Sequence, residues 1–146
     1  MDYKFRDCTL EDFEFLFELK KQSFKLYVDK IWGWRDEEQR ERLKKDLDEH
    51  ISHKQIIVLE NKAIGVYAKH ITEDGECFIN EISLLKEYQG QGIGTEILSK
   101  QIEENKSKNI RTILQVFKDN PAKRLYERLG FKIYGETETH YQMQKI

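Results

Sequence analysis

The stretch that decides the fold is Gln89-Gly90-Gln91-Gly92-Ile93-Gly94-Thr95, which follows a strand-like segment at Glu76–Leu85. It opens a pattern of apolar residues at helical spacing: Ile93, Ile97, Leu98 and Ile102. Glycine tolerates positive φ and lets backbone N–H groups approach a ligand closely. A helix N-terminus adds unpaired donors and a partial positive charge. The motif therefore predicts either a cradle for a phosphate group or an ordinary turn between a strand and a helix.

Three kinds of phosphate-binding loop compete for this motif. The Walker loop requires Lys followed by Ser or Thr after its last glycine, whereas Thr95 and Glu96 follow Gly94 here. The dinucleotide fingerprint requires a third Gly or Ala three positions after Gly92, where this chain has Thr95. The pyrophosphate loop of acyl-coenzyme A enzymes follows the pattern Q/R-x-x-G-x-G/A, which Gln89, Gly92 and Gly94 satisfy in full. The spacing favours this third loop.

Working outward from the motif, the chain alternates between strand and helix patterns. We expect strands at Tyr3–Phe5, Ile56–Leu59, Ala63–Ile71, Glu76–Leu85, Ile110–Phe117, Phe131–Glu136 and Thr139–Lys145, and helices from Leu10 into the twenties, at Asp36–Glu49, from Ile93 to about Lys106 and at Asn120–Leu129. We interpret Tyr27–Trp34 as a turn or a broken helix end. The order β-α-α-β-β-β-α-β-α-β-β predicts one α/β (α+β) domain over residues 1–146. Its sheet is mixed and largely antiparallel, with about seven strands flanked by about four helices.

Single residues at the ends of these elements predict how the helices are capped. Thr9, which precedes the acidic Glu11 and Asp12, is expected to cap the first helix. Asn120, followed by Pro121 at the first helical position, is expected to begin the last helix, and Gly130 is expected to end it. Within Glu76–Leu85, the alternation places Phe78, Ile82 and Leu84 on one face of the strand.

Composition limits the classes of function. Against 27 acidic residues the chain has 25 Lys and Arg, a net charge of −2, so it lacks the basic excess that non-specific nucleic-acid binding demands. No run of 18 apolar residues predicts a membrane span, and the charged N-terminus shows no signal peptide. Cys8 and Cys77 lack metal-type spacing, which predicts two reduced thiols in a cytoplasmic protein. His50 and His53 have no evident third ligand, so we expect no metal.

Two blocks of sequence resemble the GNAT superfamily of N-acetyltransferases. The first is Glu87–Gly94, and the second combines Asn120-Pro121-Ala122, Leu125-Tyr126 and Gly130-Phe131. The resemblance covers nearly the whole chain and is most specific over Glu76–Phe131. Lys86 is a departure from the family pattern, since many members carry proline at this position before the loop. The replacement of proline by lysine alters the local rigidity of the backbone. The resemblance implies that acetyl-CoA is the co-substrate, held by Ser83, Leu84, Gln89, Gly90, Gln91, Gly92, Ile93, Gly94, Thr95 and Asn120.

Acetyl transfer to an amine needs a base and an acid. An alkyl ammonium has a pKa near 10.4, so at neutral pH it is protonated and cannot attack the thioester until it loses its proton. A carboxylate can take that proton directly or through water. Glu81 is the candidate base, because it is charged within an otherwise apolar strand and lies where many relatives hold a functional Glu. The alternatives are that Glu81 faces solvent or that a water chain is the base. Tyr126 is either a core aromatic or, as the resemblance implies, the acid for the departing thiolate.

The acceptor site is the least visible in the sequence. In the family, the first two helices and their connection help to form the acceptor pocket. Here that connection holds Tyr27, Trp32 and Trp34, which either line a pocket for an amine or pack as ordinary aromatics. His140 either borders the pocket or is a hydrogen-bonded surface residue.

We therefore expect an acetyl-CoA-dependent N-acetyltransferase, an acyltransferase that works by direct transfer in a ternary complex. The alternative is a non-catalytic acyl-CoA-binding domain of the same fold. The expected partner is a small-molecule or peptide amine, with no nucleic acid and no membrane, and the protein is expected to be a monomer or a homodimer.

Overall fold

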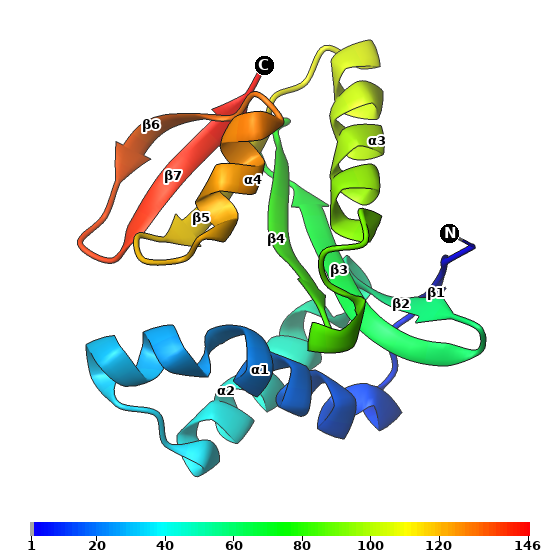
Figure 1. The fold of residues 1–146 in the computed structure, drawn as a ribbon, viewed down its shortest axis with the longest axis vertical. Coiled ribbons are helices and arrows are strands. Elements are labelled where there is room, and N and C mark those ends of the chain that lie inside the picture. Colours follow the sequence, from blue (N-terminus) through cyan, green and yellow to red (C-terminus); the bar gives the residue numbers. More distant parts are fainter. Residues whose placement is uncertain (1) are drawn as a thin grey trace. The chain divides into compact units, whose positions relative to one another are not determined.

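The computed structural model describes residues 2–146. Its strands form one seven-stranded sheet in the order β1-β2-β3-β4-β5-β7-β6 (Figure 1). The expected order of elements is confirmed, and the sheet is mixed, since β4 and β5 run parallel and the other described pairs run antiparallel. The chain divides into two compact units. The first holds the residues up to Ala68 together with Glu81–Gln89, and the second holds Lys69–Asn80 and Gly90–Ile146.

The first unit combines two helices with the first strands of the sheet. Its elements are β1 (Lys4–Asp7), α1 (Phe13–Trp32), α2 (Asp36–His50), β2 (Lys54–Leu59) and most of β3 (Lys62–Ile71), with short 3-10 turns at Leu10–Asp12, Ile51–His53 and Lys86–Tyr88. A core cluster joins both helices to β2 and β3 through Leu16, Phe17, Leu19, Leu43, Leu47, Ile56 and Val66. Burial of these apolar side chains is the main force that holds the helices on the strands.

A buried carboxylate fixes the entry into α1. The Asp12 side chain accepts two hydrogen bonds from the Arg6 guanidinium, at 2.9 and 2.7 Å, and one from the Thr9 backbone N–H at 2.8 Å. The hydrogen bonds from Arg6 hold the pKa of Asp12 below its usual value. Thr9 is the cap of the first 3-10 turn, as its position before Glu11 and Asp12 predicted.

Helix α1 is longer than the sequence pattern predicted. The segment Tyr27–Trp34 was expected to be a turn or a broken end, but the helix runs to Trp32. The helical spacing of Phe24 and the buried Val28 continues the apolar face, and the chain has no Gly or Pro before Gly33. The helix ends at Gly33, which has φ = 82°. Asp29 closes this end, because its carbonyl accepts the Gly33 N–H and its carboxylate accepts the Trp34 N–H.

The second unit holds the remaining helices and strands, namely β4 (Cys77–Leu84, which begins in this unit), α3 (Ile93–Ser107), β5 (Thr112–Phe117), α4 (Ala122–Arg128), β6 (Lys132–Glu136) and β7 (His140–Lys145). Strand β7 lies between β5 and β6, as Figure 1 shows. Within this unit β4 pairs in parallel with β5 over Cys77–Ile79 and Thr112–Leu114.

The buried face of β4 differs from the expected one. The sequence pattern placed Phe78, Ile82 and Leu84 together on one face, whereas the structure buries Cys77, Ile79 and Ser83 along with Leu84, and leaves Phe78 and Ile82 half-buried. The cause is that β4 is a central strand of the sheet. Apart from the exposed Asn80, residues on both faces of β4 are buried or half-buried, so alternation of apolar and polar residues does not identify a single buried face.

Candidate functional site

The glycine turn that precedes α3 has the conformation that its sequence demands. Gly90 and Gly92 have φ of 74° and 85°, values that side chains rarely allow, and Gly92 is the N-cap of α3. A Cβ built at either position would meet nothing within 4 Å. Gly92 has no side chain, and no side-chain hydrogen bond caps the start of α3. This geometry suits an anion at the helix N-terminus.

The first unit holds the residues that lead into the turn. The Gln89 side-chain amide donates a hydrogen bond to the Leu84 carbonyl at 3.0 Å, which ties the start of the turn to the end of β4. The buried Ser83 hydroxyl donates to the Glu81 carboxylate at 2.9 Å. Glu81 is half-buried and lies on the same parity as Cys77, Ile79 and Ser83, which the structure buries. The structure therefore brings Glu81, Ser83, Leu84 and Gln89 together.

Helix α1 contributes a lysine to the surroundings of Glu81. Lys20 is half-buried, and burial lowers its pKa. The Glu81 carboxylate is the largest influence that acts in the opposite direction, which places these two groups within electrostatic range of one another.

Sequence reasoning missed one residue of this region, Gly65 in β3. An ideal Cβ on Gly65 would lie 2.3 Å from the Ser83 carbonyl oxygen and 2.8 Å from Leu84 Cδ2. Only a glycine lets β3 approach the end of β4 this closely. The available signal was a single glycine inside the strand pattern Ala63–Ile71, which typically marks a bulge or a close backbone approach. Gly65 thus permits the close approach of β3 to the backbone at Ser83 and Leu84.

The second unit holds Tyr126, in the last turn of α4. The Gly130 N–H binds the Glu127 carbonyl and the Phe131 N–H binds the Tyr126 carbonyl, both at 3.0 Å, and Gly130 has φ = 94°. These bonds form a Schellman motif, completed by the edge-to-face contact of the Tyr126 and Phe131 rings at 5.9 Å. The predicted C-terminal cap at Gly130 is confirmed. Tyr126 is half-buried, and its ring lies against that of Phe131.

Asn120 has the capping role that its position before Pro121 predicted. Its side-chain oxygen accepts the Ala122 N–H at 2.9 Å. Pro121 has φ = −64° and ψ = −13°, so it already has helical geometry. The side chain of Asn120 thus stabilises the start of α4, the helix that carries Tyr126.

The predicted acceptor residues have different surroundings. Trp32 is 63 % exposed at the end of α1, and Tyr27 is half-buried one turn earlier. Trp34 packs against the core: its ring lies 6.2 Å from that of the buried Phe17, and its indole N–H donates to Asp36. Trp34 therefore has a packing role whatever else it contacts.

His140, in the second unit, is half-buried at the start of β7. Its ring packs on Phe117, with 4.2 Å between centroids, and its Nδ1 lies 2.7 Å from the Thr139 hydroxyl oxygen. Burial lowers the pKa of His140 below its usual value.

The described residues include two thiols and several His, Asp and Glu side chains that could serve as metal ligands. Cys8 and Cys77 are both free and buried. Among residues 2–146, no group of three or more His, Cys, Asp or Glu side chains is arranged to hold a metal ion. Within the same residues, no helix has the length and apolar character that crossing a membrane requires.

Comparison with known proteins identifies the family to which the chain belongs. Residues 13–131 match the sequence model of the acetyltransferase (GNAT) family. The chain is also 30 % identical over 131 residues to the ribosomal protein bS18-alanine N-acetyltransferase of Haemophilus influenzae, and the match covers 89 % of this chain and 82 % of that protein. The chain therefore belongs to the GNAT acetyltransferase family.

Solved structures show the same fold. The PaiA N-acetyltransferase of Thermoplasma acidophilum in complex with coenzyme A superposes with a TM-score of 0.76 at 21 % identity, over 99 % of both chains. An N-acetyltransferase of Staphylococcus aureus Mu50 gives a TM-score of 0.75 at 17 % identity, over 97 % of this chain and 100 % of that one. Arabidopsis thaliana Naa50, in complex with the bisubstrate analogue CoA-Ac-MVNAL, gives 0.64 at 17 % identity, over 100 % and 99 %.

Proposed function

We propose that this protein transfers an acetyl group from acetyl-CoA to a primary amine, directly and in a ternary complex. The observation that carries the proposal is the glycine turn. Gly90 and Gly92 have positive φ, open space lies beside both, and the turn leads into the N-terminus of α3 in a chain of the GNAT family. An acyl-CoA pyrophosphate is the anion that such a turn is suited to hold in this family.

In this proposal the co-substrate is held mainly by backbone groups. The N–H groups of the turn, from Gln89 to Thr95, bind the pyrophosphate, and Asn120 contacts coenzyme A. The backbone at Ser83 and Leu84 pairs with the pantetheine arm and the thioester, in the manner of an added strand. The hydrogen bond from Gln89 to the Leu84 carbonyl supports this assignment, because it fixes the strand end and the start of the turn to each other. No metal takes part.

Glu81 is the proposed base. Its carboxylate accepts the proton of the acceptor ammonium, directly or through water, and the neutral amine then attacks the thioester carbonyl carbon. The hydrogen bond from Ser83 holds the carboxylate in one orientation, which favours proton transfer over a fixed path. The new C–N bond forms as the C–S bond breaks.

Tyr126 is the proposed acid. Its phenol gives a proton to the departing thiolate of coenzyme A and is reprotonated from solvent. An unperturbed phenol has a pKa near 10 and is therefore protonated at neutral pH. The Schellman motif that ends α4 supports this role, since it fixes the ring instead of leaving it at a frayed helix end.

The acceptor is proposed to be an amine on a peptide or protein, or a small-molecule amine. The bS18-alanine N-acetyltransferase relative and the bisubstrate complex of Naa50 support the peptide class. Tyr27, Trp32, Trp34 and His140 are the proposed contacts, and Trp34 also packs on the ring of Phe17. An exposed indole such as that of Trp32 can contact a cationic amine through its ring face.

A thiol-release assay across peptide and small-molecule amines, with product masses measured, tests the proposal. An increase of 42 Da in an amine together with release of free thiol is the expected result. Tyr126→Phe should lower turnover with little change in acetyl-CoA affinity, and Glu81→Gln should move the pH–rate profile to higher pH. Acetyl-CoA binding without turnover on any amine would favour the non-catalytic acyl-CoA-binding domain. Absence of binding to folded protein would refute both functions.

A further inference from the structure

Helix α3 is held in two different ways along its length. Its N-terminal half is anchored by apolar side chains, since Ile93, Ile97 and Leu98 are buried. Its C-terminal half is anchored by polar side chains, of which Gln101 and Asn105 are buried. Apolar packing has little directional preference, whereas hydrogen bonds fix both distance and angle. The polar half is therefore the part that can define where the helix lies along its own axis.

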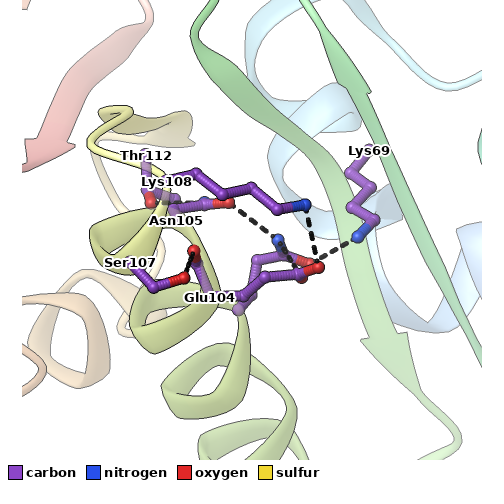
Figure 2. Close-up of polar contacts among 7 residues, drawn as sticks. Lys69, Glu104, Asn105, Ser107, Lys108 and Thr112 are labelled. Atoms are coloured by element: carbon purple, nitrogen blue, oxygen red, sulfur yellow. Dashed lines mark hydrogen bonds and ion pairs between the residues drawn. The ribbon is translucent and has the colours of Figure 1, made fainter.

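The polar contacts form a continuous chain from β3 through α3 to β5, shown in Figure 2. Lys69 of β3 donates to the Gln101 side-chain carbonyl at 2.6 Å, and the Gln101 amide donates to the Asn105 carbonyl oxygen at 3.0 Å. The Asn105 amide then donates to the Thr112 hydroxyl of β5 at 2.7 Å. All of these residues belong to the second unit.

One acidic and one basic side chain, Glu104 and Lys108, extend this set of hydrogen bonds to the exposed side of α3. The Gln101 amide also donates to Glu104 at 3.1 Å, and Lys108 pairs with the same carboxylate at 3.2 Å. The cations Lys108 and Lys69 help to hold the pKa of Glu104 below its usual value. The carboxylate thus stays ionised and keeps accepting the hydrogen bond from Gln101.

The inner members of the chain are deeply buried and fully partnered. Asn105 is 2 % exposed and Thr112 is 1 % exposed. Among residues 2–146, no buried side-chain nitrogen or oxygen lacks a hydrogen-bond partner. A fully satisfied buried network adds specificity of arrangement, because sliding or rotating the helix would leave several of its groups unpaired.

We propose that Gln101, Asn105 and Thr112 are positioning residues for the glycine turn. They fix the axial position and rotation of α3, and the stiff helix transmits this to Gly92 at its N-cap. Gly92 lies nine residues before Gln101, roughly 14 Å along the helix axis. The N–H groups of the first helical turn are thereby held where the pyrophosphate is proposed to bind. The inference rests on the proposed function for the identity of that ligand.

Two substitutions at Thr112 separate the hydrogen bond from packing. Thr112→Val keeps the shape and removes the hydroxyl that accepts from Asn105, whereas Thr112→Ser keeps the hydroxyl and removes a methyl group. If the network positions the turn, Thr112→Val should weaken acetyl-CoA binding about tenfold, the effect of losing one good hydrogen bond to the pyrophosphate. Thr112→Ser should stay within about twofold of wild type. A packing role alone would instead make Ser the more harmful change.

A second readout does not involve the ligand. Hydrogen exchange at the Glu96 amide, which donates to the Gly92 carbonyl at 3.0 Å, reports the first turn of α3. Thr112→Val should speed this exchange and Thr112→Ser should not. Glu103→Gln, on the exposed face of the same helix, is the control and should change neither measurement. If Thr112→Val does not fold, Gln101→Met takes its place, because it removes the hydrogen bonds of the Gln101 amide and keeps the length of the side chain.

Failure of the proposed function and failure of the positioning role give different results. If wild-type protein binds no acetyl-CoA in calorimetry while Thr112→Val still speeds exchange at Glu96, the proposed function is wrong and the positioning role stands. If wild-type protein binds acetyl-CoA while Thr112→Val or its Gln101→Met substitute leaves both affinity and exchange unchanged, the positioning role is refuted.

Discussion

Substitution of Gly65 by alanine should disturb the end of β4 more than the usual effect of one added methyl group. The new Cβ would lie 2.3 Å from the Ser83 carbonyl oxygen, where ordinary contact begins at 3.4 Å. The nearest atoms include backbone, so the strands must part by about 1 Å, since no flexible side chain can absorb the strain. Overpacking of this kind costs about 1–3 kcal/mol. The neighbouring hydrogen bond from the Leu85 N–H to the Ile64 carbonyl adds about 1 kcal/mol if it breaks.

We therefore expect Gly65→Ala to lower the free energy of unfolding by about 2–4 kcal/mol. It should also weaken acetyl-CoA binding, because the backbone of Ser83 and Leu84 would move away from the position proposed for the thioester arm. Urea unfolding measures the first effect and isothermal titration calorimetry at 15 °C, on protein shown to be folded by circular dichroism, measures the second. Ala68→Gly is the matched control, since it removes a methyl group from the same strand and should keep the affinity. A Gly65→Ala protein with the wild-type urea midpoint would refute the steric argument, and unchanged affinity in a destabilised variant would refute the placement of the thioester arm.

Three further predictions concern stability and the reactivity of a thiol. The hydrogen bonds of Arg6 lower the folded-state pKa of Asp12 below its unfolded value of about 3.9, so this stabilisation is complete above about pH 4 and is lost as the pH falls through the folded pKa. Asp12→Asn should therefore flatten the acid limb of a stability–pH curve, and an unchanged slope would contradict the pairing. Burial raises the pKa of the Cys8 thiol to about 11, so an aromatic disulfide at pH 8 should label native Cys8 about a hundredfold more slowly than the urea-unfolded chain. Equal rates would mean that the thiol is open to solvent. Leu47→Ala, at a site 1 % exposed, should cost about 2–5 kcal/mol in urea unfolding. The matched change Leu26→Ala, at a site 75 % exposed, should cost less than about 0.5 kcal/mol.

The fold could be predicted where local chemistry and tertiary structure agree. The order of elements followed from periodicity, and the caps at Asn120 and Gly130 followed from residue types with one dominant use. The end of α1 could not be predicted, because Tyr27–Trp34 is rich in aromatic residues, which occur in both helices and turns. There the helix continues until Gly33 stops it, and only the packing of Val28 on the core shows why.

The candidate site was predictable to the extent that its chemistry lies in one contiguous motif. The positive φ values of Gly90 and Gly92 could be expected from the glycine spacing alone. Contacts between residues far apart in the sequence could not be predicted. The sequence does not indicate that Gly65 lies close to Ser83, or that hydrogen bonds connect Lys69 to Thr112.

Glu81 shows why the pattern of a strand is weak evidence for the role of a charged residue in it. Where one face of a strand packs on the core and the other is exposed to solvent, a glutamate on the exposed face is simply solvated and needs no further explanation. Strand β4 is central, and Glu81 shares its parity with the buried Ile79 and Ser83. A half-buried carboxylate on such a strand loses hydration, and the hydroxyl of Ser83 supplies one fixed donor in its place. A carboxylate held in this way is costly to keep for stability alone, because Glu81→Leu would fill the same volume without desolvating a charge. The physical argument thus favours a chemical role for Glu81. A Glu81→Leu protein that is fully active, or one that is clearly less stable than wild type, would remove that argument.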